Sequence, residues 1–451
     1  MKLRAAIVLV GLLAAAPADA RLVVGRIVVD TPTKTRTYVL SSRMNLAEGD
    51  GVDFEKLASA EQRLIESDLF AAARVYIDLP RAQAAQLMYV DEAVEKVDVH
   101  VEVTEKTSWF IIPIASLGSG DYAAGVAYGD QNLLGHDLQV LGAGQVGQAR
   151  SYVFATIRNP LVHAAPLTWT LDAIVSHERI RFYDNHQIIF EVPTLIAGGA
   201  AQLGYVFSSH LRVLGGFSGR YQKVDAGEVV EASAAQPAYN PLSGKIFLLT
   251  LSVAYDATQA PDGLRHGVRL LVKEELSDRY WGSDFDYSKF EVRTELYGKL
   301  GWNYPSLLVN AVVDYPTSSR GVPLTEMLRI GGSNLRGYQA NEFHGDTLLS
   351  VQAEDQVVLF RGLPLPFVES RFNIAGAVFI DAAALLERHP GGTSVDLPGP
   401  ARPKLSDFHT SVGAGLRAIL PGVAIPAIKV DIGYGIDVSS FAVTISVAGG
   451  G

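Results

Sequence analysis

The stretch EVRTELYGKLGW, residues 291–302, decides the fold because its side chains alternate between two kinds. One face of an extended chain would carry Val292, Thr294, Leu296, Leu300 and Trp302, and the other Glu291, Arg293, Glu295, Tyr297 and Lys299. Strands of soluble sheets are typically about five or six residues long, whereas a tilted strand of a membrane barrel needs about 9 to 11. An alternating run of this length therefore predicts a transmembrane barrel strand.

The same alternation recurs from Trp109 to the C-terminus, for example in LTWTLDAIV (residues 167–175) and KVDIGYGIDV (residues 429–438). Each such run between two breaks is interpreted as a strand. The predicted strands are 109–115, 121–129, 136–144, 150–158, 166–176, 194–207, 210–222, 244–256, 266–276, 287–300, 304–315, 347–360, 371–382, 408–419, 426–437 and 439–448. We therefore expect a membrane all-β fold, a 16-stranded antiparallel barrel over residues 107–451.

The lengths of the predicted connections support this segmentation. Connections after odd-numbered strands include 177–193, 223–243, 277–286, 316–346 and 383–407, whereas those after even-numbered strands are mostly short. Bacterial barrels have short periplasmic turns and long outer loops. Long connections on one side only are what that sidedness predicts.

Residues 1–20 predict a secretory signal peptide. They begin with Lys2 and Arg4, continue with the apolar run 5–16 and end in the A-x-A cleavage site ADA at residues 18–20. An N-terminal anchor helix is the alternative, but the apolar run is shorter than the roughly 20 residues needed to cross a bilayer. We therefore expect an exported protein cleaved after Ala20.

Composition and charge exclude several classes of protein. The 451 residues contain no cysteine, which excludes disulfides, thiolate metal sites and cysteine nucleophiles. Without residues 1–20 the chain has 36 basic and 47 acidic residues, so its net charge changes from −10 to −11. A net-acidic exported chain lacks the basic footprint of nucleic-acid-binding proteins, so we expect no nucleic-acid partner.

Residues 21–106 follow a different pattern. The strand-like stretch LVVGRIVVD precedes two segments with helical spacing, TKTRTYVLSS and VDFEKLASAEQRLIESD, and two further strands follow in ARVYIDL and VEKVDVHVEVTE. Asp53 stands before the second helix as a cap. The order strand, helix, helix, strand, strand predicts a small α+β domain with its own core.

Motifs for catalysis and cofactor binding do not fit this chain. VLGAGQVG (residues 140–147) contains G-x-G-x-x-G, but an alternating strand follows instead of the helix that a dinucleotide site requires. These glycines predict a hairpin tip or a bend in the barrel. The ten histidines form no HExxH motif, and G-x-S-x-G is absent from the sequence. We expect no enzymatic activity, no cofactor and no metal site.

The stretch GGSNLRGYQ, residues 331–339, places a single arginine, Arg336, in the longest predicted connection. Three glycines that allow unusual backbone angles surround it, namely Gly331, Gly332 and Gly337. If the loop folds back into the barrel, the guanidinium would meet the acids of the two following strands, Glu354 and Asp381. The alternative is a solvated arginine on an outer loop, and these residues alone do not decide between the two.

Several motifs of the chain resemble those of the outer-membrane protein assembly and translocation superfamily, which is also called the BamA/TamA-like or bacterial surface antigen family. GGSNLRGY is similar to the family's sixth-loop signature, which here comprises Gly331, Gly332, Arg336, Gly337 and Tyr338. VFIDAA (residues 378–383) is similar to the thirteenth-strand motif with Asp381 at the acidic position, and Glu354 in VQAED matches the twelfth-strand acid. GDQNLLG (residues 129–135) and YDATQAPDG (residues 255–263) resemble two turns of the family's barrel.

The resemblance implies a fold and a function. Residues 21–106 would form one periplasmic POTRA domain, and residues 107–451 an outer-membrane barrel of sixteen strands. Its sixth loop, about 316–346, would fold into the lumen, where Arg336 would pair with Glu354 and Asp381. A lateral seam between the first and last strands would open so that other proteins are inserted or translocated, with the POTRA domain capturing them.

The resemblance also implies the partners. These are outer-membrane lipids, unfolded outer-membrane or secreted proteins, and periplasmic chaperones or accessory lipoproteins. A two-partner secretion transporter is an alternative within the family, and a passive porin or structural barrel is an alternative outside it. The chain departs from the family in having space for only one POTRA domain, in Ala383 at an expected glycine, and in the C-terminal SVAGGG, which lacks an aromatic residue.

Overall fold

The computed structural model describes residues 22–67, 69–77, 95–118, 120–162, 166–184, 186–231, 237, 239–260, 263–364, 371–386, 404, 407–419 and 428–447. These residues form two compact units. The first comprises the described residues up to Ser108 and Asn132–Asp137, and the second Trp109–Gln131 and the described residues from Leu138 onward. The predicted signal peptide and the C-terminal glycines lie outside the described residues. Within the described part, no helix has the length and apolar character needed to cross a membrane.

The first unit is a three-stranded sheet with two helices. Its elements are β1 (Leu22–Val29), α1 (Thr37–Met44), α2 (Phe54–Glu66), β2 (Phe70–Ile77) and β3 (Glu95–Glu105), in the order that the sequence predicts. The central strand β3 runs parallel to β1 and antiparallel to β2. The carboxylate of Asp53 accepts a hydrogen bond from the Lys56 N–H at 2.7 Å, which caps α2. One face of α2, with Leu57 and Leu64, is buried in the core of this unit.

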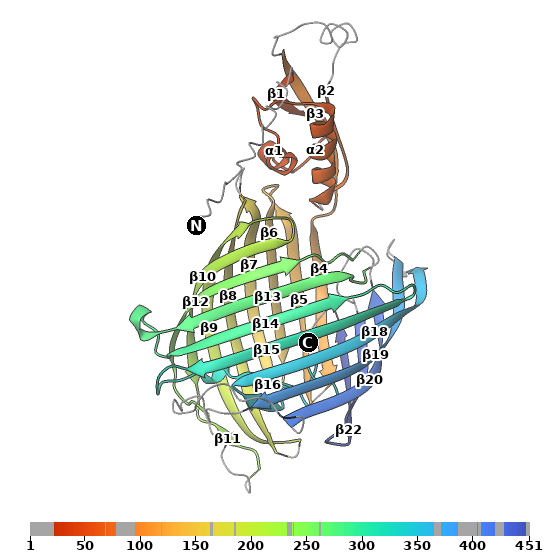
Figure 1. The fold of residues 1–451 in the computed structure, drawn as a ribbon. Helices are drawn as coiled ribbons and strands as arrows, with labels where there is room; N and C mark the ends of the chain where they lie inside the picture. Colours follow the sequence, from red (N-terminus) through yellow and green to blue (C-terminus); the bar gives the residue numbers. More distant parts are fainter. Residues whose placement is uncertain are drawn as a thin grey trace, which may run out of the picture. The chain divides into compact units, whose positions relative to one another are not determined.

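The second unit is a closed antiparallel barrel (Figure 1). Its long strands are β4 (Trp109–Gly118), β5 (Asp121–Leu133), β6 (Leu138–Gly147), β7 (Arg150–Val162), β8 (Leu167–Asp184), β9 (Gln187–Val206), β10 (Leu211–Val224), β12 (Gly244–Asp256), β13 (Gly267–Ser277), β14 (Tyr287–Tyr297), β15 (Asn303–Pro316), β18 (Thr347–Pro364), β19 (Arg371–Leu386), β20 (Phe408–Ile419), β21 (Ile428–Gly435) and β22 (Ser440–Val447). The short strand β11 (Glu228–Val229) pairs with β9, and η1 (Arg279–Trp281) lies between β13 and β14. The predicted 16-stranded barrel is confirmed.

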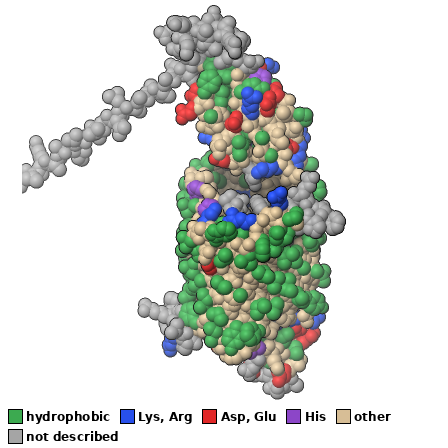
Figure 2. All heavy atoms as spheres, turned by 90° about the vertical axis from the view of Figure 1, so that its right-hand side faces the viewer, with side chains coloured by type: hydrophobic (Ala, Val, Ile, Leu, Met, Phe, Trp, Pro, Cys, Tyr) green, Lys and Arg blue, Asp and Glu red, His purple; other side chains and the backbone are tan. Residues whose placement is uncertain are grey.

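Alternation along each strand gives the barrel wall two different faces. On β14, Phe290 and Leu296 are exposed on the outside, whereas Glu295 is buried inside. Figure 2 shows hydrophobic side chains spread over the outer wall of the barrel. An apolar outer face and a polar interior are the arrangement that a barrel needs in a lipid bilayer.

One predicted connection is wrong. The predicted long outer loop 177–193 is instead taken up by two paired strands, with β8 continuing to Asp184 and β9 beginning at Gln187. The physical reason is a change of polarity along β8. Its outward face changes from apolar residues such as Val175 to Arg179, while its inward face changes from Thr168 to Ile180 and Phe182.

The inward apolar residues of this extension have a partner inside the barrel. Ile180 and Phe182 are buried in one cluster with Leu324, which belongs to the long connection between β15 and β18. An apolar interior therefore replaces the polar one wherever another chain segment fills the barrel. The sequence pattern does not contain this information.

The other connections that the structure describes keep the predicted sidedness. The long connections 225–243, 278–286 and 317–346 follow the seventh, ninth and eleventh strands of the barrel, which are β10, β13 and β15. The short turns 207–210 and 298–302 follow the sixth and tenth strands, which are β9 and β14. The glycine-rich stretch 140–147 lies within β6, whose last residue, Gly147, precedes the turn to β7.

Candidate functional site

The connection 317–346 forms a structured plug, which we call the lumenal loop. It contains η2 (Leu324–Glu326) and the strands β16 (Leu328–Ile330) and β17 (Phe343–Gly345), which pair with each other as a small antiparallel hairpin. Its core residues Ile330, Leu335 and Tyr338 are buried with Val312 and Leu348 of the barrel wall. The loop therefore packs against the wall as a folded element.

Ion pairs and hydrogen bonds fix one side of the lumenal loop. Arg329 donates from its Nη1 and Nη2 to both oxygens of Glu178 on β8, at 2.6 and 3.2 Å. Arg220 on β10 donates to Glu326 at 2.6 Å. The hydroxyl of Tyr183, near the end of β8, donates to the Ala340 carbonyl at 3.2 Å.

The other side of the loop contacts strands far away around the ring. Arg336 contacts acids on β18 and β19, and the Tyr338 hydroxyl donates to the Thr410 carbonyl on β20 at 2.9 Å. In the closed barrel, five strands, β11 to β15, lie between β10 and β18 on one side. A loop that contacts both β8–β10 and β18–β20 lies inside the lumen.

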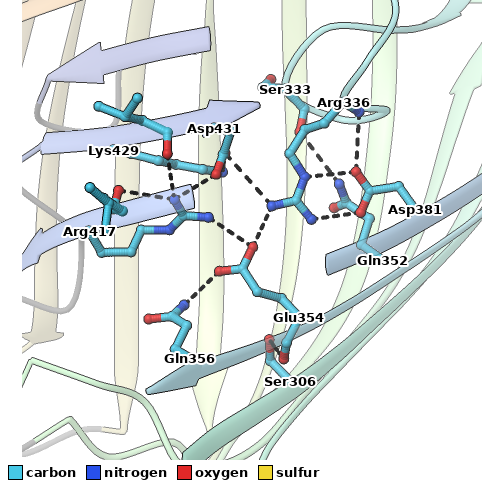
Figure 3. A network of polar contacts seen from close by, with 12 residues as sticks. Ser306, Ser333, Arg336, Gln352, Glu354, Gln356, Asp381, Arg417, Lys429 and Asp431 are labelled. Atoms are coloured by element: carbon cyan, nitrogen blue, oxygen red, sulfur yellow. Dashed lines mark hydrogen bonds and ion pairs between the residues drawn. The ribbon is translucent and has the colours of Figure 1, made fainter. Parts of the chain in front are cut away.

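Arg336 is held by two carboxylates, which Figure 3 shows, and by an aromatic ring. Its Nε and Nη2 donate to the two oxygens of Asp381, each at 2.7 Å, and its backbone N–H donates to the same carboxylate at 3.1 Å. Its Nη1 donates to Glu354. Its Cζ lies 3.4 Å from the ring centre of Phe379. The guanidinium therefore has a bidentate partner, a second acid and a cation–π contact.

Burial makes these contacts stronger than those of a surface pair. Arg336 is 3% exposed and Asp381 is 0% exposed. Burial by itself would lower the pKa of Arg336, but its hydrogen bonds and ion pairs to Asp381 and Glu354 raise it above the usual value. The arginine stays charged, and removing it would leave buried acids without their partner.

A second arginine, which the sequence analysis did not single out, completes the network. Arg417 on β20 is 1% exposed. Its Nη2 donates to Glu354 at 3.0 Å, and its Nη1 forms an ion pair with Asp431 on β21 at 2.6 Å. Lys429 forms an ion pair with the other oxygen of Asp431 at 3.1 Å. Three cations, Arg336, Arg417 and Lys429, thus balance three carboxylates in the interior of the barrel.

The sequence contains an indirect signal for Arg417. Arg417 and Lys429 are direct partners across β20 and β21. Like charges in that position repel each other and require nearby acids. Once the strand register is known, Asp431 and Glu354 are the acids that offset this repulsion by pairing with the two cations. Phe379 carries no such signal, because its place on the same face of β19 as Asp381 does not show that Arg336 of the lumenal loop stacks on it.

Glycines on both partners let the loop backbone approach the wall. All three glycines singled out in the sequence, Gly331, Gly332 and Gly337, have positive φ. Gly337 has φ +95°, and a Cβ there would lie 2.8 Å from the Gly435 nitrogen. A Cβ on Gly433 would lie 2.6 Å from the Gly337 nitrogen. Backbone therefore packs on backbone where Arg336 enters the network.

Tyr338 adds a second anchor next to the arginine. It is buried, and its hydroxyl donates to Asp437 in the turn between β21 and β22 as well as to Thr410. Burial and the neighbouring carboxylate raise the pKa of Tyr338 above its usual value, so the hydroxyl keeps its proton and remains a donor.

We call this network of Arg336, Arg417, Lys429, Glu354, Asp381 and Asp431 the clamp, because its ion pairs join the lumenal loop to the barrel wall. Its cations are arginines and a lysine already paired with carboxylates, so they hold the loop in one position. Among the described residues, no group of three or more His, Asp or Glu side chains is placed to hold a metal ion.

The barrel closes where β22 pairs with β4, a junction that we call the seam. Within the described residues, β22 pairs with β4 through Thr444–Gly118, Ile445–Leu117, Ser446–Ser116 and Val447–Ala115, a total of four residue pairs. The neighbouring ladders have eight pairs between β21 and β22 and ten between β4 and β5. Residues 109–114 of β4 thus have partners on β5 but none on the described part of β22.

The closed antiparallel barrel with a loop clamped in its lumen is a membrane-type β-barrel that holds a folded segment of its own chain. The Omp85 superfamily domain matches residues 132–440. The chain belongs to the Omp85 superfamily. This membership and the closed barrel indicate an outer-membrane location.

Solved structures share the fold at low sequence identity. BamA from Haemophilus ducreyi lacking POTRA domains 1–3 has 15% identity and a TM-score of 0.63, and the match covers 94% of this chain and 84% of that chain. CdiB from Acinetobacter baumannii has 14% identity and a TM-score of 0.61, covering 94% and 73%. CdiB from Escherichia coli has 11% identity and a TM-score of 0.52, covering 97% and 91%. No functionally curated protein matches the sequence.

Proposed function

We propose that this protein inserts or translocates other proteins at the outer membrane by opening its seam. The observation that carries the proposal is the seam itself, with four residue pairs between the first and last barrel strands in the described chain. Membership of the Omp85 superfamily supports a role with protein substrates.

The seam has the physical properties of a weak junction. Each unpaired backbone N–H or C=O in hydrocarbon costs several kcal/mol, so a barrel wall stays closed along a long ladder. A short ladder costs less to open, and Pro113 on β4 provides no N–H for pairing. The exposed edge could pair with a strand of an incoming protein, which would then enter the membrane without unpaired backbone groups.

The first unit would act as a periplasmic capture domain of the POTRA type. Its order of elements is strand, helix, helix, strand, strand, and β1 and β2 are the two edge strands of its sheet. Edge strands present backbone donors and acceptors to an unfolded chain. One such domain in residues 21–106 is part of the proposal.

The alternative within the superfamily is a transporter dedicated to one secreted partner. The similarity to CdiB structures establishes only the fold, and the same barrel suits both roles. A passive porin or structural barrel is the alternative outside the superfamily's protein-handling role.

Depletion of the protein, followed by proteomics of the outer membrane and of the secreted fraction, tests the proposal. An insertion factor lowers the amounts of several barrel proteins, and a dedicated transporter lowers one secreted protein. Re-expression of the wild-type chain should restore either profile. Unchanged profiles in both fractions would contradict the proposal and favour a passive barrel.

A further inference from the structure

Outside the clamp, a cavity of about 690 Å³ lies within the barrel. Its lining includes four arginines from four strands, Arg158 on β7, Arg212 on β10, Arg269 on β13 and Arg293 on β14. Arg158, Arg212 and Arg269 lie within a few residues of the strand ends joined by the short turns. The lumenal loop is attached to β15 and β18, at the opposite end of the barrel.

The strand register places three of these arginines on the inner face. Asp256, Arg269 and Glu295 are direct partners across β12, β13 and β14. Arg212 belongs to the adjacent inner row, which continues through Ala254 and Leu271 to Arg293. Side chains that are direct partners point to the same side of a sheet, so both rows face the cavity.

Two acids of the cavity already have partners. Glu295 accepts hydrogen bonds from Arg293 at 2.8 Å and from the Tyr297 hydroxyl at 2.7 Å. Asp256 accepts from the Thr258 hydroxyl at 2.6 Å and forms an ion pair with Arg269 at 3.4 Å. These carboxylates therefore neutralise Arg269 and Arg293.

Arg158 and Arg212 differ from the other two. Neither makes a hydrogen bond or a close ion pair with any residue in the described part of the chain. Both side chains are half-buried, and both line the same cavity. The direct partners of Arg158 on the neighbouring strands, Gln139 and Thr170, are neutral. Asp256 attracts Arg212 from beyond ion-pair distance but is already bound by Thr258 and Arg269. Two partly desolvated guanidiniums without a closely paired acid favour an anion from outside the chain.

A second cavity extends this basic surface along the lumen. Its volume is about 420 Å³, and it shares Arg293 with the first cavity. Arg265, Arg417 and Lys429 also line it. Glu354 and Asp431 already balance Arg417 and Lys429, so the two cations without a close ion pair are those at the short-turn end, where a chain segment entering the lumen would meet them first.

We propose that Arg158 and Arg212 form a binding site for the carboxylate side chains of an acidic, unfolded polypeptide segment that enters the lumen from the short-turn end. This proposal rests on the proposed function, because a protein substrate supplies the segment. Each guanidinium can donate two parallel hydrogen bonds to one carboxylate, in a lumen where such bonds are less screened than at the surface.

Peptide binding to the purified full-length protein in non-ionic detergent tests the site. The probes are a fluorescent Asp/Glu-rich peptide and a Ser/Gly-rich peptide of equal length. We expect the acidic peptide to bind in a salt-sensitive manner, and the double variant Arg158→Gln/Arg212→Gln to weaken its affinity at least about tenfold. Arg158→Lys/Arg212→Lys should retain part of the affinity because it keeps the charge.

The matched control is Arg320→Gln/Arg361→Gln, which removes two exposed arginines and the same charge. It should bind the acidic peptide as the wild-type protein does, and heat-modifiability on gels should show that every variant is folded. Equal binding by the Arg158→Gln/Arg212→Gln variant, or equally tight binding of the Ser/Gly peptide, would overturn the proposal. Displacement of the peptide by inorganic phosphate at equal concentration would also overturn it, because the site would then be one for small anions.

Failure of the site and failure of the proposed function give different results. If Arg158→Gln/Arg212→Gln binds the acidic peptide as the wild type does and depletion still alters the proteomic profiles, the binding site is wrong and the proposed function stands. Specific binding together with unchanged profiles would leave the site and remove the function.

Discussion

At the scale of single residues, Arg336 is the centre of the interior. Replacing it with alanine should destabilise the folded barrel by about 3–5 kcal/mol, because Asp381 would be left buried without its bidentate partner. The midpoint of heat- or urea-induced unfolding in detergent measures this change. Arg320→Ala, at an exposed arginine of the same loop, is the control and should be nearly neutral.

Arg336→Lys separates charge from geometry. A lysine keeps the positive charge but cannot donate two parallel hydrogen bonds to Asp381, so its unfolding midpoint should lie between those of the wild type and Arg336→Ala. A midpoint for Arg336→Ala equal to that of the Arg320→Ala control would show that the clamp does not stabilise the barrel.

Asp437 makes the second anchor sensitive to acid. Burial acts to raise its pKa, but hydrogen bonds from Tyr338 and His409 hold the pKa below the ordinary value of 3.8. A carboxyl group with a lowered pKa stabilises the fold above its unfolded-state pKa, and this contribution is lost as the pH falls through the folded-state value. Stability should therefore decline below about pH 4. Unfolding midpoints at pH 6 and pH 3 should differ less in Asp437→Asn than in the wild type; equal differences would argue against this anchor.

The sequence allowed part of the candidate site to be predicted. Arg336, Glu354 and Asp381 could be singled out because they stand in recognisable motifs, and the structure brings them together in the lumen. Arg417 and Phe379 could not, because their roles depend on which strands are neighbours and on the residue opposite each one.

At the scale of elements, alternation was sufficient to predict the strands inside the bilayer. There the environment is the same for every strand, with lipid outside and a polar lumen inside, so a single pattern identifies them all. The pattern failed in the extension of β8 and β9, where Ile180 and Phe182 point inward onto the lumenal loop. That contact joins segments far apart in the chain, and periodicity does not report it.

The contact between the lumenal loop and β21 depends on backbone proximity. In Gly433→Ala, the added Cβ would lie 2.6 Å from the Gly337 nitrogen and 2.8 Å from the Arg336 carbonyl carbon, so the loop must shift. We expect faster proteolysis within residues 317–346 and a lower unfolding midpoint. Gly215→Ala on β10 is the control, because a Cβ there would have no atom within 4 Å. Equal proteolysis of the two variants would contradict a tight contact.

At the scale of the whole molecule, two regions of the barrel have opposite properties. The clamp ties the lumenal loop to β18, β19 and β21 with buried ion pairs. The seam joins β22 to β4 through four described pairs. This contrast places the movement required by the proposed function at the seam, while the interior remains fixed.

A cross-link through the seam tests the central claim most directly. The natural chain has no cysteine, so Ser116→Cys/Ser446→Cys introduces one pair of thiols at directly opposed positions of β4 and β22. The control, Ser116→Cys/Ala123→Cys, links β4 to its other neighbour, β5. In depleted cells, the oxidised seam variant should fail to restore the outer-membrane and secreted profiles, reduction should restore them, and the control should restore them in both states. Full activity of the oxidised, cross-linked seam variant would contradict the account.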